Sequence, residues 1–366
     1  MHFHAKAWPH LIMDTFLELM SSFRRRLHRM KARREELRRH NASQERDDLL
    51  ASGDQPAFLA ALSHQFPDAV QPAKSYLASL DETPSRDAHR FVVTHQREGR
   101  IESFHHFLGA LFYPLILHEA KFGFEPGSVL HVQDCGSLNR HLEKFSEYIG
   151  ATLRFFPAEI ASSLAAANAD KLLRLPPFDG SNFSDKWLHD HEIEAIRSFG
   201  FKWAANDAAA DIPVLVISRG ESDRYFATER FRNFYPVPER WNQTGSSRRH
   251  IPNEAEMIQA ISNEITPHVV QLETTDFSEQ IELFKRARIV IGQHGAGLNG
   301  LLWCKPGTCV LEILPYSMLG EPDTFFRNMA LRLNLRHSFM IQNGEHEPVD
   351  PRAIARYVDR HRVLSV

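Results

Sequence analysis

The sequence predicts an α/β protein built on parallel sheets, and three observations support that fold class. Short runs of β-branched and apolar residues recur along the chain, each with the length of a buried strand. Stretches with helical apolar spacing lie between these runs, as they do in βαβ units. Glycine, proline and asparagine turns separate the two kinds of segment. We therefore expect two α/β domains, preceded by a helical region.

Length and composition fit this fold class. A chain of 366 residues is long for one hydrophobic core and suffices for two domains. Its 43% hydrophobic and 24% charged residues are typical of globular proteins, and its net charge of −3 argues against general nucleic-acid binding. Three cysteines, Cys135, Cys304 and Cys309, are too few for a disulfide framework, so we expect a reducing compartment.

Residues 1–90 are expected to form a helical, basic N-terminal region. Nine lysines and arginines lie between Arg24 and Arg39, after an apolar stretch. Two interpretations remain open for this segment, a solvated surface helix and a peripheral contact with an anionic membrane. Residues 1–20 lack the apolar run of a signal peptide, and no apolar stretch reaches membrane-spanning length. We therefore expect a cytoplasmic protein. Peripheral attachment to the inner face of the membrane is the alternative localisation that remains to be tested.

The first α/β domain is expected at residues 91–205. Its predicted strands are residues 91–93, 128–134 and 151–156, and its predicted helices are residues 102–118, 138–149 and 188–199. A strand, a helix and a strand over 128–156 imply a right-handed βαβ unit. Pro114 is expected to kink or end the helix that begins near His105 and His106.

The second α/β domain is expected at residues 206–340. Its predicted strands are residues 214–219, 269–273, 289–291 and 309–314, and its predicted helices are residues 253–261, 277–288 and 298–303. Four strands alternating with three helices make a Rossmann-like half. Asn253 suits an N-cap, with Glu254 in the first turn. The C-terminal segment, residues 341–366, is expected to be a helix that packs back on the N-terminal domain.

The stretch from Arg288 to Pro315 combines a strand, a glycine turn, a helix start and a second strand. Amides at a helix start lack partners and favour an anion, and Gly295 and Gly297 let a phosphate approach the backbone. Ser218 and Arg219 end another buried strand, where open parallel sheets bind ligands. The plain alternative is an ordinary tight turn of an α/β domain.

Four blocks of residues, in order, resemble glycosyltransferase family 61. They are His106–Leu108, Ile217–Arg219, Arg249–Glu254, and a long block from Asp276 through Leu298 to Pro306–Thr308 and Glu312. The resemblance covers residues 95–320 and is most specific in the last block. It implies the GT-B arrangement of two facing Rossmann-like domains. It also implies an inverting transferase that uses a nucleotide-diphosphate sugar.

On that resemblance, the turn at 294–298 would hold the donor diphosphate, while Arg219, Arg249 and His294 add positive charge to the leaving group. Glu312 would suit the ribose hydroxyls, or serve only as an ion-pair partner. The expected donor-binding residues are Ser218, Arg219, Arg249, Asn253, Glu254, Gln293, His294, Gly295, Ala296, Gly297, Leu298, Asn299 and Glu312. No Asp-x-Asp pair occurs in the sequence, so we expect metal-independent transfer with no cofactor beyond the nucleotide sugar.

Inversion needs a base that takes the proton of the acceptor hydroxyl. The candidates are His106, which we favour, His105, Asp134 and Glu102. The expected acceptor is a glycan or glycolipid of a capsule, a lipopolysaccharide or another surface polysaccharide.

Two alternatives to this enzyme remain. In the family, an acidic residue usually follows the histidine of the first block, and glycine or alanine stands there in this chain, which keeps open a non-catalytic sugar- or nucleotide-binding module. The histidines also suggest a metal hydrolase. Its candidate ligands are His2, His4 and residues 105–106, 190–192 and 345–347, although none has the i, i+4 spacing of known sites.

Overall fold

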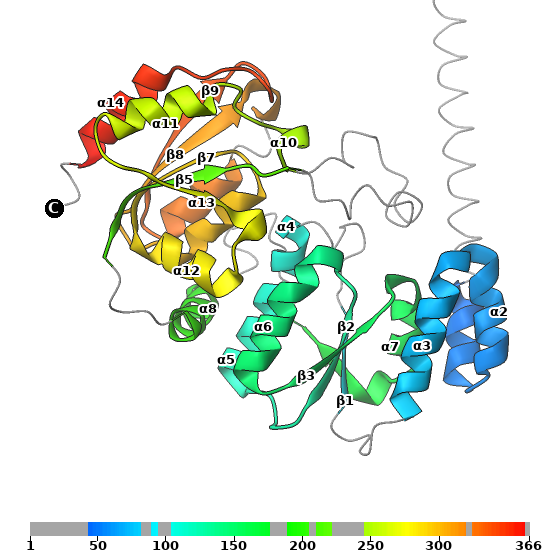
Figure 1. Ribbon diagram of the computed structural model, residues 1–366. Helices are drawn as coiled ribbons and strands as arrows, with labels where there is room; N and C mark the ends of the chain where they lie inside the picture. The colour runs from blue at the N-terminus through cyan, green and yellow to red at the C-terminus, as the bar shows by residue number, and fades with distance from the viewer. Residues whose placement is uncertain are drawn as a thin grey trace, which may run out of the picture. The chain divides into compact units, whose positions relative to one another are not determined.

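The computed structural model describes residues 43–81, 89–93, 104–175, 189–204, 210–221, 245–319 and 324–362. The chain divides into two compact units (Figure 1). Residues up to 83 together with 156–172 form the first unit, and residues 84–155 together with 173–366 form the second. The basic segment Arg24–Arg39 and the candidate base Glu102 lie outside the described residues.

The first unit is helical. Its main helices are α2 (Gln55–Gln65), α3 (Val70–Asp81) and α7 (Ala161–Ala167). The Asp54 side chain caps α2 by accepting a hydrogen bond of 3.1 Å from the Ala57 amide. Phe58 and Leu62 on α2 are fully buried, and Tyr76 on α3 meets Phe156 edge to face. Of the predicted helical region 1–90, the described residues 43–81 are mainly helical, whereas residues 89–90 belong to strand β1 (His89–Val93).

The second unit contains both sheets, and the smaller has the order β3-β2-β1-β4. Its strands are β1 (His89–Val93), β2 (Val129–Gln133), β3 (Thr152–Phe156) and β4 (Leu172–Arg174). β1 pairs with β2 in parallel, and α6 (Asn139–Ile149) connects β2 to β3 as the βαβ prediction requires. Only β4, which is three residues long, was not predicted.

The larger sheet has the order β6-β5-β7-β8-β9, with every pair parallel. Its strands are β5 (Ile212–Ser218), β6 (His268–Gln271), β7 (Ala287–Gln293), β8 (Cys309–Pro315) and β9 (Arg336–Gln342). The chain first adds β6 on one side of β5 and then crosses to β7 on the other side. This reversal makes the point between β5 and β7 the topological switch point, where α/β sheets bind ligands.

Helices cover both faces of the larger sheet (Figure 1). They are α11 (Glu254–Ser262), α12 (Phe277–Arg286), the 3₁₀ helix η10 (Ala296–Trp303), α13 (Thr324–Arg332) and α14 (Pro351–Arg362). Val214 and Val216 pack in one core with residues of α11 and α14, whereas Leu215 packs in the other core with α12 and η10. Because strand side chains alternate, a continuous apolar run supplies both cores.

The C-terminal helix α14 packs differently from our expectation. Ile354 and Val358 are buried in the core that contains α11, and the Tyr357 hydroxyl donates to the carbonyl of Val310 in β8 at 3.0 Å. Among the described residues, α14 therefore belongs to the larger sheet and does not pack back on the N-terminal domain. The apolar residues of α14 cover the part of the same sheet face that α11 leaves uncovered.

Pro114 does not end its helix. The helix runs through α4 (Phe104–Phe107), a π-helical turn (Leu108–Phe112) and α5 (Tyr113–Phe122). The wider turn lies directly before Pro114, so the missing proline N–H falls where the regular hydrogen-bond ladder is already interrupted. Gly123, with φ of 70°, then ends the helix.

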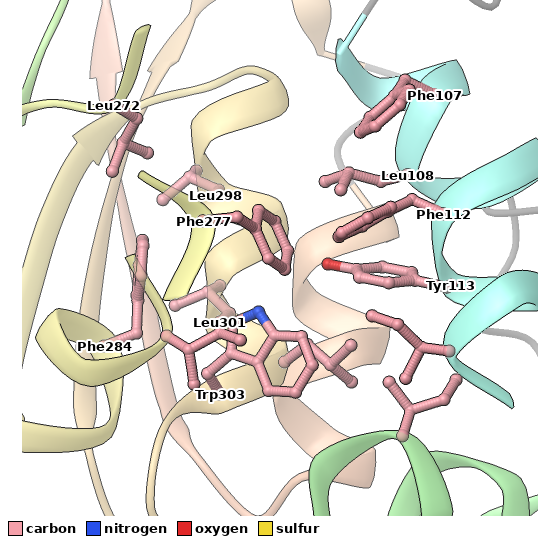
Figure 2. Packing of buried hydrophobic residues seen from close by; sticks show 14 of the residues in the cluster. Phe107, Leu108, Phe112, Tyr113, Leu272, Phe277, Phe284, Leu298, Leu301 and Trp303 are labelled. Carbon is pink, nitrogen blue, oxygen red and sulfur yellow. The ribbon is translucent and has the colours of Figure 1, made fainter. Parts of the chain in front are cut away.

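This helix shares an aromatic core with the larger sheet (Figure 2). Phe112 lies 4.7 Å from Phe277 between ring centroids, and Tyr113 lies 6.0 Å from Trp303. Trp303 ends η10, and Arg197 of α8 (Asp190–Trp203) donates hydrogen bonds to the carbonyls of Leu302 and Cys304 there. None of the helices in the described ranges is long and apolar enough to span a membrane.

Gly200→Ala is expected to destabilise the fold by about 1–3 kcal/mol through overpacking. A Cβ at Gly200 would lie 2.3 Å from Trp303 Cζ3, and the indole is fully buried with no room to retreat. Urea unfolding of the variant measures the loss. Ser198→Ala, on the exposed face of the same helix, is the matched control and should leave the free energy of unfolding within about 0.5 kcal/mol.

Two buried histidines are expected to weaken the fold in acid. Burial lowers the pKa of His131 and of His141 to about 3, assisted by His89 and Arg140 respectively. The unfolded chain binds protons below about pH 6.5 while the folded chain does not, so stability rises with pH between about 3 and 6.5. His141→Gln should flatten this slope by up to about 1.4 kcal/mol per pH unit, measured by urea unfolding across that range. An unchanged slope, equal to that of the exposed control His268→Gln, would contradict it.

Candidate functional site

The predicted donor residues gather at the switch point of the larger sheet. β5 and β7 pair in the register Ile217 opposite Gly292, which brings the ends of the two strands side by side. Ser218 and Arg219 at one strand end therefore neighbour Gln293 and His294 at the other. The sheet order thus assembles at one edge residues that lie about 75 positions apart in the chain.

Two arginines converge on the glycine turn. Arg219 Nη2 and Arg249 Nη1 each donate a hydrogen bond of 2.9 Å to the backbone carbonyl of His294. The next residue, Gly295, has φ of 154° and ψ of −174°, a conformation that side chains disfavour. A Cβ at Gly295 would also lie 2.1 Å from Arg219 Nη2. Glycine is therefore required here for the guanidinium to reach the turn.

Positive charge is concentrated around this turn. Burial lowers the pKa of Arg219 to about 10, with a further contribution from the charge of Arg249, and Arg248 is lowered to about 10 by the same two causes. Glu345 partly offsets the charge, with its Oε1 at 3.2 Å from Arg249 Nε. Like charges held together out of water are costly, so the arrangement favours a bound anion.

Ser218 and Glu254 form a direct pair, with the hydroxyl donating to Glu254 Oε2 at 2.7 Å. Asn253 occupies the N-cap position of α11, but the prediction that its side chain caps the helix is wrong. Its amide instead donates to the carbonyl of Val349 at 2.9 Å and accepts from the Val349 amide at 3.0 Å. These two bonds use both the donor and the acceptor of the Asn253 side chain, whereas capping the helix would use only its oxygen.

Gln293 holds the loop that follows β9. Its Nε2 donates to Gln342 Oε1 at 2.6 Å and to the carbonyl of Glu345 at 3.2 Å, and its buried Oε1 has no partner among the described residues. The His250 amide donates to the same Glu345 carbonyl at 3.0 Å. The segment 342–349 thus supports Arg249, and sequence reasoning missed it because β9 was not recognised.

Glu312 is fixed by two histidines. It is 1% exposed, its Oε1 lies 2.5 Å from His294 Nδ1, and its Oε2 lies 2.8 Å from His337 Nε2. Burial alone would raise the pKa of Glu312, but the hydrogen bonds and charges of the two histidines lower it below its ordinary value. Binding of ribose by Glu312 stays a prediction, since both carboxylate oxygens are engaged here. His337 was not predicted.

The remaining residues of the turn serve packing and orientation. Leu298 is buried in the aromatic core, and Gly297 lies close to Ile217 and Leu272. The Asn299 amide donates to the carbonyl of Ala296 at 2.7 Å, which fixes the start of η10.

The candidate bases lie differently from one another. His105 Nδ1 is 3.3 Å from Asn299 Nδ2, and its ring meets Phe325 edge to face. His106 is a neighbour of His105, at 5.4 Å between ring centroids. Asp134 Oδ1 accepts hydrogen bonds from the Gly136 amide at 2.8 Å and from Asn139 at 2.9 Å, which is a turn-forming role. The structure therefore brings His105 directly to the turn helix.

Among the described residues, the candidate metal ligands of the rival enzyme do not converge, and His2 and His4 lie outside these residues. In the described ranges, no group of three or more His, Cys, Asp or Glu side chains is arranged to hold a metal ion. Asp190 pairs with Arg332, and Glu192 with Lys121 at 3.0 Å. Glu345 is engaged by Arg249.

The protein is thus an α/β protein in which an arginine-lined glycine turn lies at the switch point of a parallel sheet, the edge where such sheets bind ligands. The glycosyltransferase 61 family model matches residues 8–311, and the chain belongs to this family of sugar-transferring enzymes.

Curated relatives are similar over a shorter segment. Protein O-linked-mannose β-1,4-N-acetylglucosaminyltransferase 2 of Tetraodon nigroviridis is 32% identical over 87 residues, which is 23% of this chain and 15% of that protein. The protein of the same name from Xenopus laevis is 30% identical over 105 residues, 28% of this chain and 18% of its own length. The human one is 30% identical over 88 residues, 24% of this chain and 15% of its own length. The chain thus spans only a small part of the curated relatives it matches.

Proposed function

We propose that this chain is an inverting glycosyltransferase that moves a sugar from a nucleotide-diphosphate donor to a hydroxyl of a glycan. The observation that carries the proposal is the convergence of Arg219 and Arg249 on the carbonyl of His294. It places two fixed cations at the start of η10, at the sheet edge where α/β proteins bind phosphates.

The chemistry of this edge suits departure of a diphosphate. Negative charge grows on the leaving oxygen as the sugar bond breaks, and preorganised guanidiniums stabilise it without rearrangement. A divalent ion supplies such charge in other transferases, and the arginines supply it here. The sequence also lacks an Asp-x-Asp pair. The proposed reaction therefore runs without a metal ion or other cofactor.

We extend the proposal to the donor sugar, the acceptor and the cellular location of the enzyme. The relatives' names include N-acetylglucosamine transfer, so a donor carrying that sugar is the first to test. The proposed acceptor is a surface polysaccharide or glycolipid, reached across a GT-B arrangement of two facing domains. We place the enzyme in the cytoplasm, with the basic segment 24–39 as its contact with anionic lipid.

A thermal-shift screen tests the donor site. UDP-N-acetylglucosamine, UDP-glucose, UDP-xylose and GDP-mannose are each added with and without EDTA. One sugar nucleotide should raise the melting temperature, unchanged by the chelator, and the protein should release the nucleoside diphosphate when acceptor is present. Stabilisation lost on chelation would overturn the metal-free reaction. Binding without any release, even hydrolytic, would favour the non-catalytic binding module.

His106→Ala is expected to lower the transfer rate by about 10²- to 10⁴-fold while leaving donor affinity unchanged, because a general base contributes on this scale. His105→Ala is the paired variant, since His105 contacts Asn299 on the turn helix. Steady-state rates and calorimetric donor affinity separate the two. If His105→Ala loses transfer and His106→Ala keeps it, the base is His105. Exposed His268→Ala should match the unaltered protein.

A further inference from the structure

The ring of His294 ends a chain of three titratable side chains. Its Nδ1 contacts Glu312 Oε1 at 2.5 Å, and Glu312 Oε2 contacts His337 Nε2 at 2.8 Å. His294 follows β7, Glu312 lies in β8 and His337 lies in β9, so the chain crosses three neighbouring strands. All three side chains are less than a tenth exposed.

The Glu312 carboxylate determines which nitrogens of the His294 and His337 rings are protonated. An ionised carboxylate only accepts hydrogen bonds, so His294 Nδ1 and His337 Nε2 must both donate. Neutral His294 is then the Nδ1–H tautomer, with a lone pair on Nε2. Protonation of His294 would add Nε2–H as a charged donor.

The ring of His294 has a second nitrogen, Nε2, on the side away from Glu312. No described residue forms a hydrogen bond with Nε2. The carbonyl of the same residue holds Arg219 and Arg249. In the protonated ring, Nε2–H would be a further donor on the proposed diphosphate turn.

We infer that His337 is a positioning residue that, through Glu312, holds the His294 ring with Nε2 presented to the leaving diphosphate. The inference rests on the proposed donor site. The charged and titratable groups that face His294 are Glu312, Arg219 and Arg249, with His337 beyond Glu312 and Glu345 beyond Arg249. From α13, the uncharged ring of Phe326 packs against it, at 5.3 Å between centroids.

Histidine ¹⁵N spectra of the full chain test this role without any ligand. His294→Ala identifies the His294 signals, which should show the Nδ1–H tautomer in the unaltered protein. His337→Ala should convert them to a tautomer mixture, because Glu312 is then free to turn. His337→Gln, whose amide reaches the same carboxylate oxygen, should preserve the tautomer. Identical His294 signals in the unaltered protein and in His337→Ala would overturn the inference, as would an Nε2–H tautomer in the unaltered protein.

UDP affinity, measured by calorimetry, provides the second readout. His337→Ala should weaken UDP binding roughly tenfold, as loss of a supporting partner does at comparable sites. The double variant with His294→Ala should bind UDP no more weakly than His294→Ala alone, because His337 acts only through that ring. Equal losses in both backgrounds would make His337 merely structural and overturn the inference. If the unaltered protein binds neither UDP nor any sugar nucleotide, the proposed donor site is wrong. The ¹⁵N spectra then still test whether His337 positions the His294 ring.

Discussion

Arg249→Ala is expected to lower kcat/KM for sugar transfer by about 100- to 1,000-fold, the scale of removing one preorganised donor from a developing negative charge. Arg249 is 4% exposed and joins three parts of the site, the His294 carbonyl, Glu345 and Met318. Its loss removes a charge next to the proposed leaving-group site and also removes the contact with Glu345. Both effects act on the transition state more than on the fold.

Release of nucleoside diphosphate from the donor chosen by the thermal-shift screen measures this effect. Arg249→Lys should recover only part of the rate, because an ammonium cannot form the same fork of hydrogen bonds. Exposed Arg352→Ala is the matched control and should keep full activity. A folded Arg249→Ala protein that transfers sugar within about twofold of the unaltered rate would show that this arginine takes no part in stabilising the charge.

The larger sheet and its turn were predictable because their signals are local. A run such as Val214–Val216 is apolar at every position, which only a strand buried on both faces requires. Gly295 lies between such a strand and an apolar helix, where its backbone conformation excludes other residues. Arg219 could be placed because strand ends of a parallel sheet meet at one edge.

Other parts of the site could not be predicted, because their role depends on distant pairing. In β9, Phe339 and Ile341 are exposed while the polar His337 is largely covered, the reverse of the usual pattern. That inversion arises because His337 faces Glu312 on the next strand, which no local pattern reveals. Missing β9 also hid the supporting loop around Glu345.

The proposed acceptor side could be predicted less fully from the sequence for the same reason. The spacing of apolar residues located the helix that carries His105 and His106, but not which of the two side chains meets the turn. A π-helical turn at Leu108–Phe112, which departs from regular helix geometry, follows these two residues, and no local pattern in the sequence predicts it.

Gly295→Ala is expected to abolish detectable transfer, and its effect exceeds that of any single side-chain truncation at the turn. The φ of 154° at this position disfavours any residue with a Cβ, at a cost of about 1–3 kcal/mol. The added methyl would also displace Arg219 from the His294 carbonyl, because the two atoms would lie 2.1 Å apart. Donor binding and charge stabilisation are therefore lost together.

Gly297→Ala is the control that separates this effect from simple crowding of the turn. Gly297 has no left-handed backbone requirement, and its Cβ would meet only the ends of Ile217 and Leu272, each at 3.2 Å. This variant should lose less than about tenfold in donor affinity and keep both arginines in place. Calorimetric binding of UDP to both variants measures the difference. Equal affinities would mean that the conformation of Gly295 and its contact with Arg219 do not form the donor site.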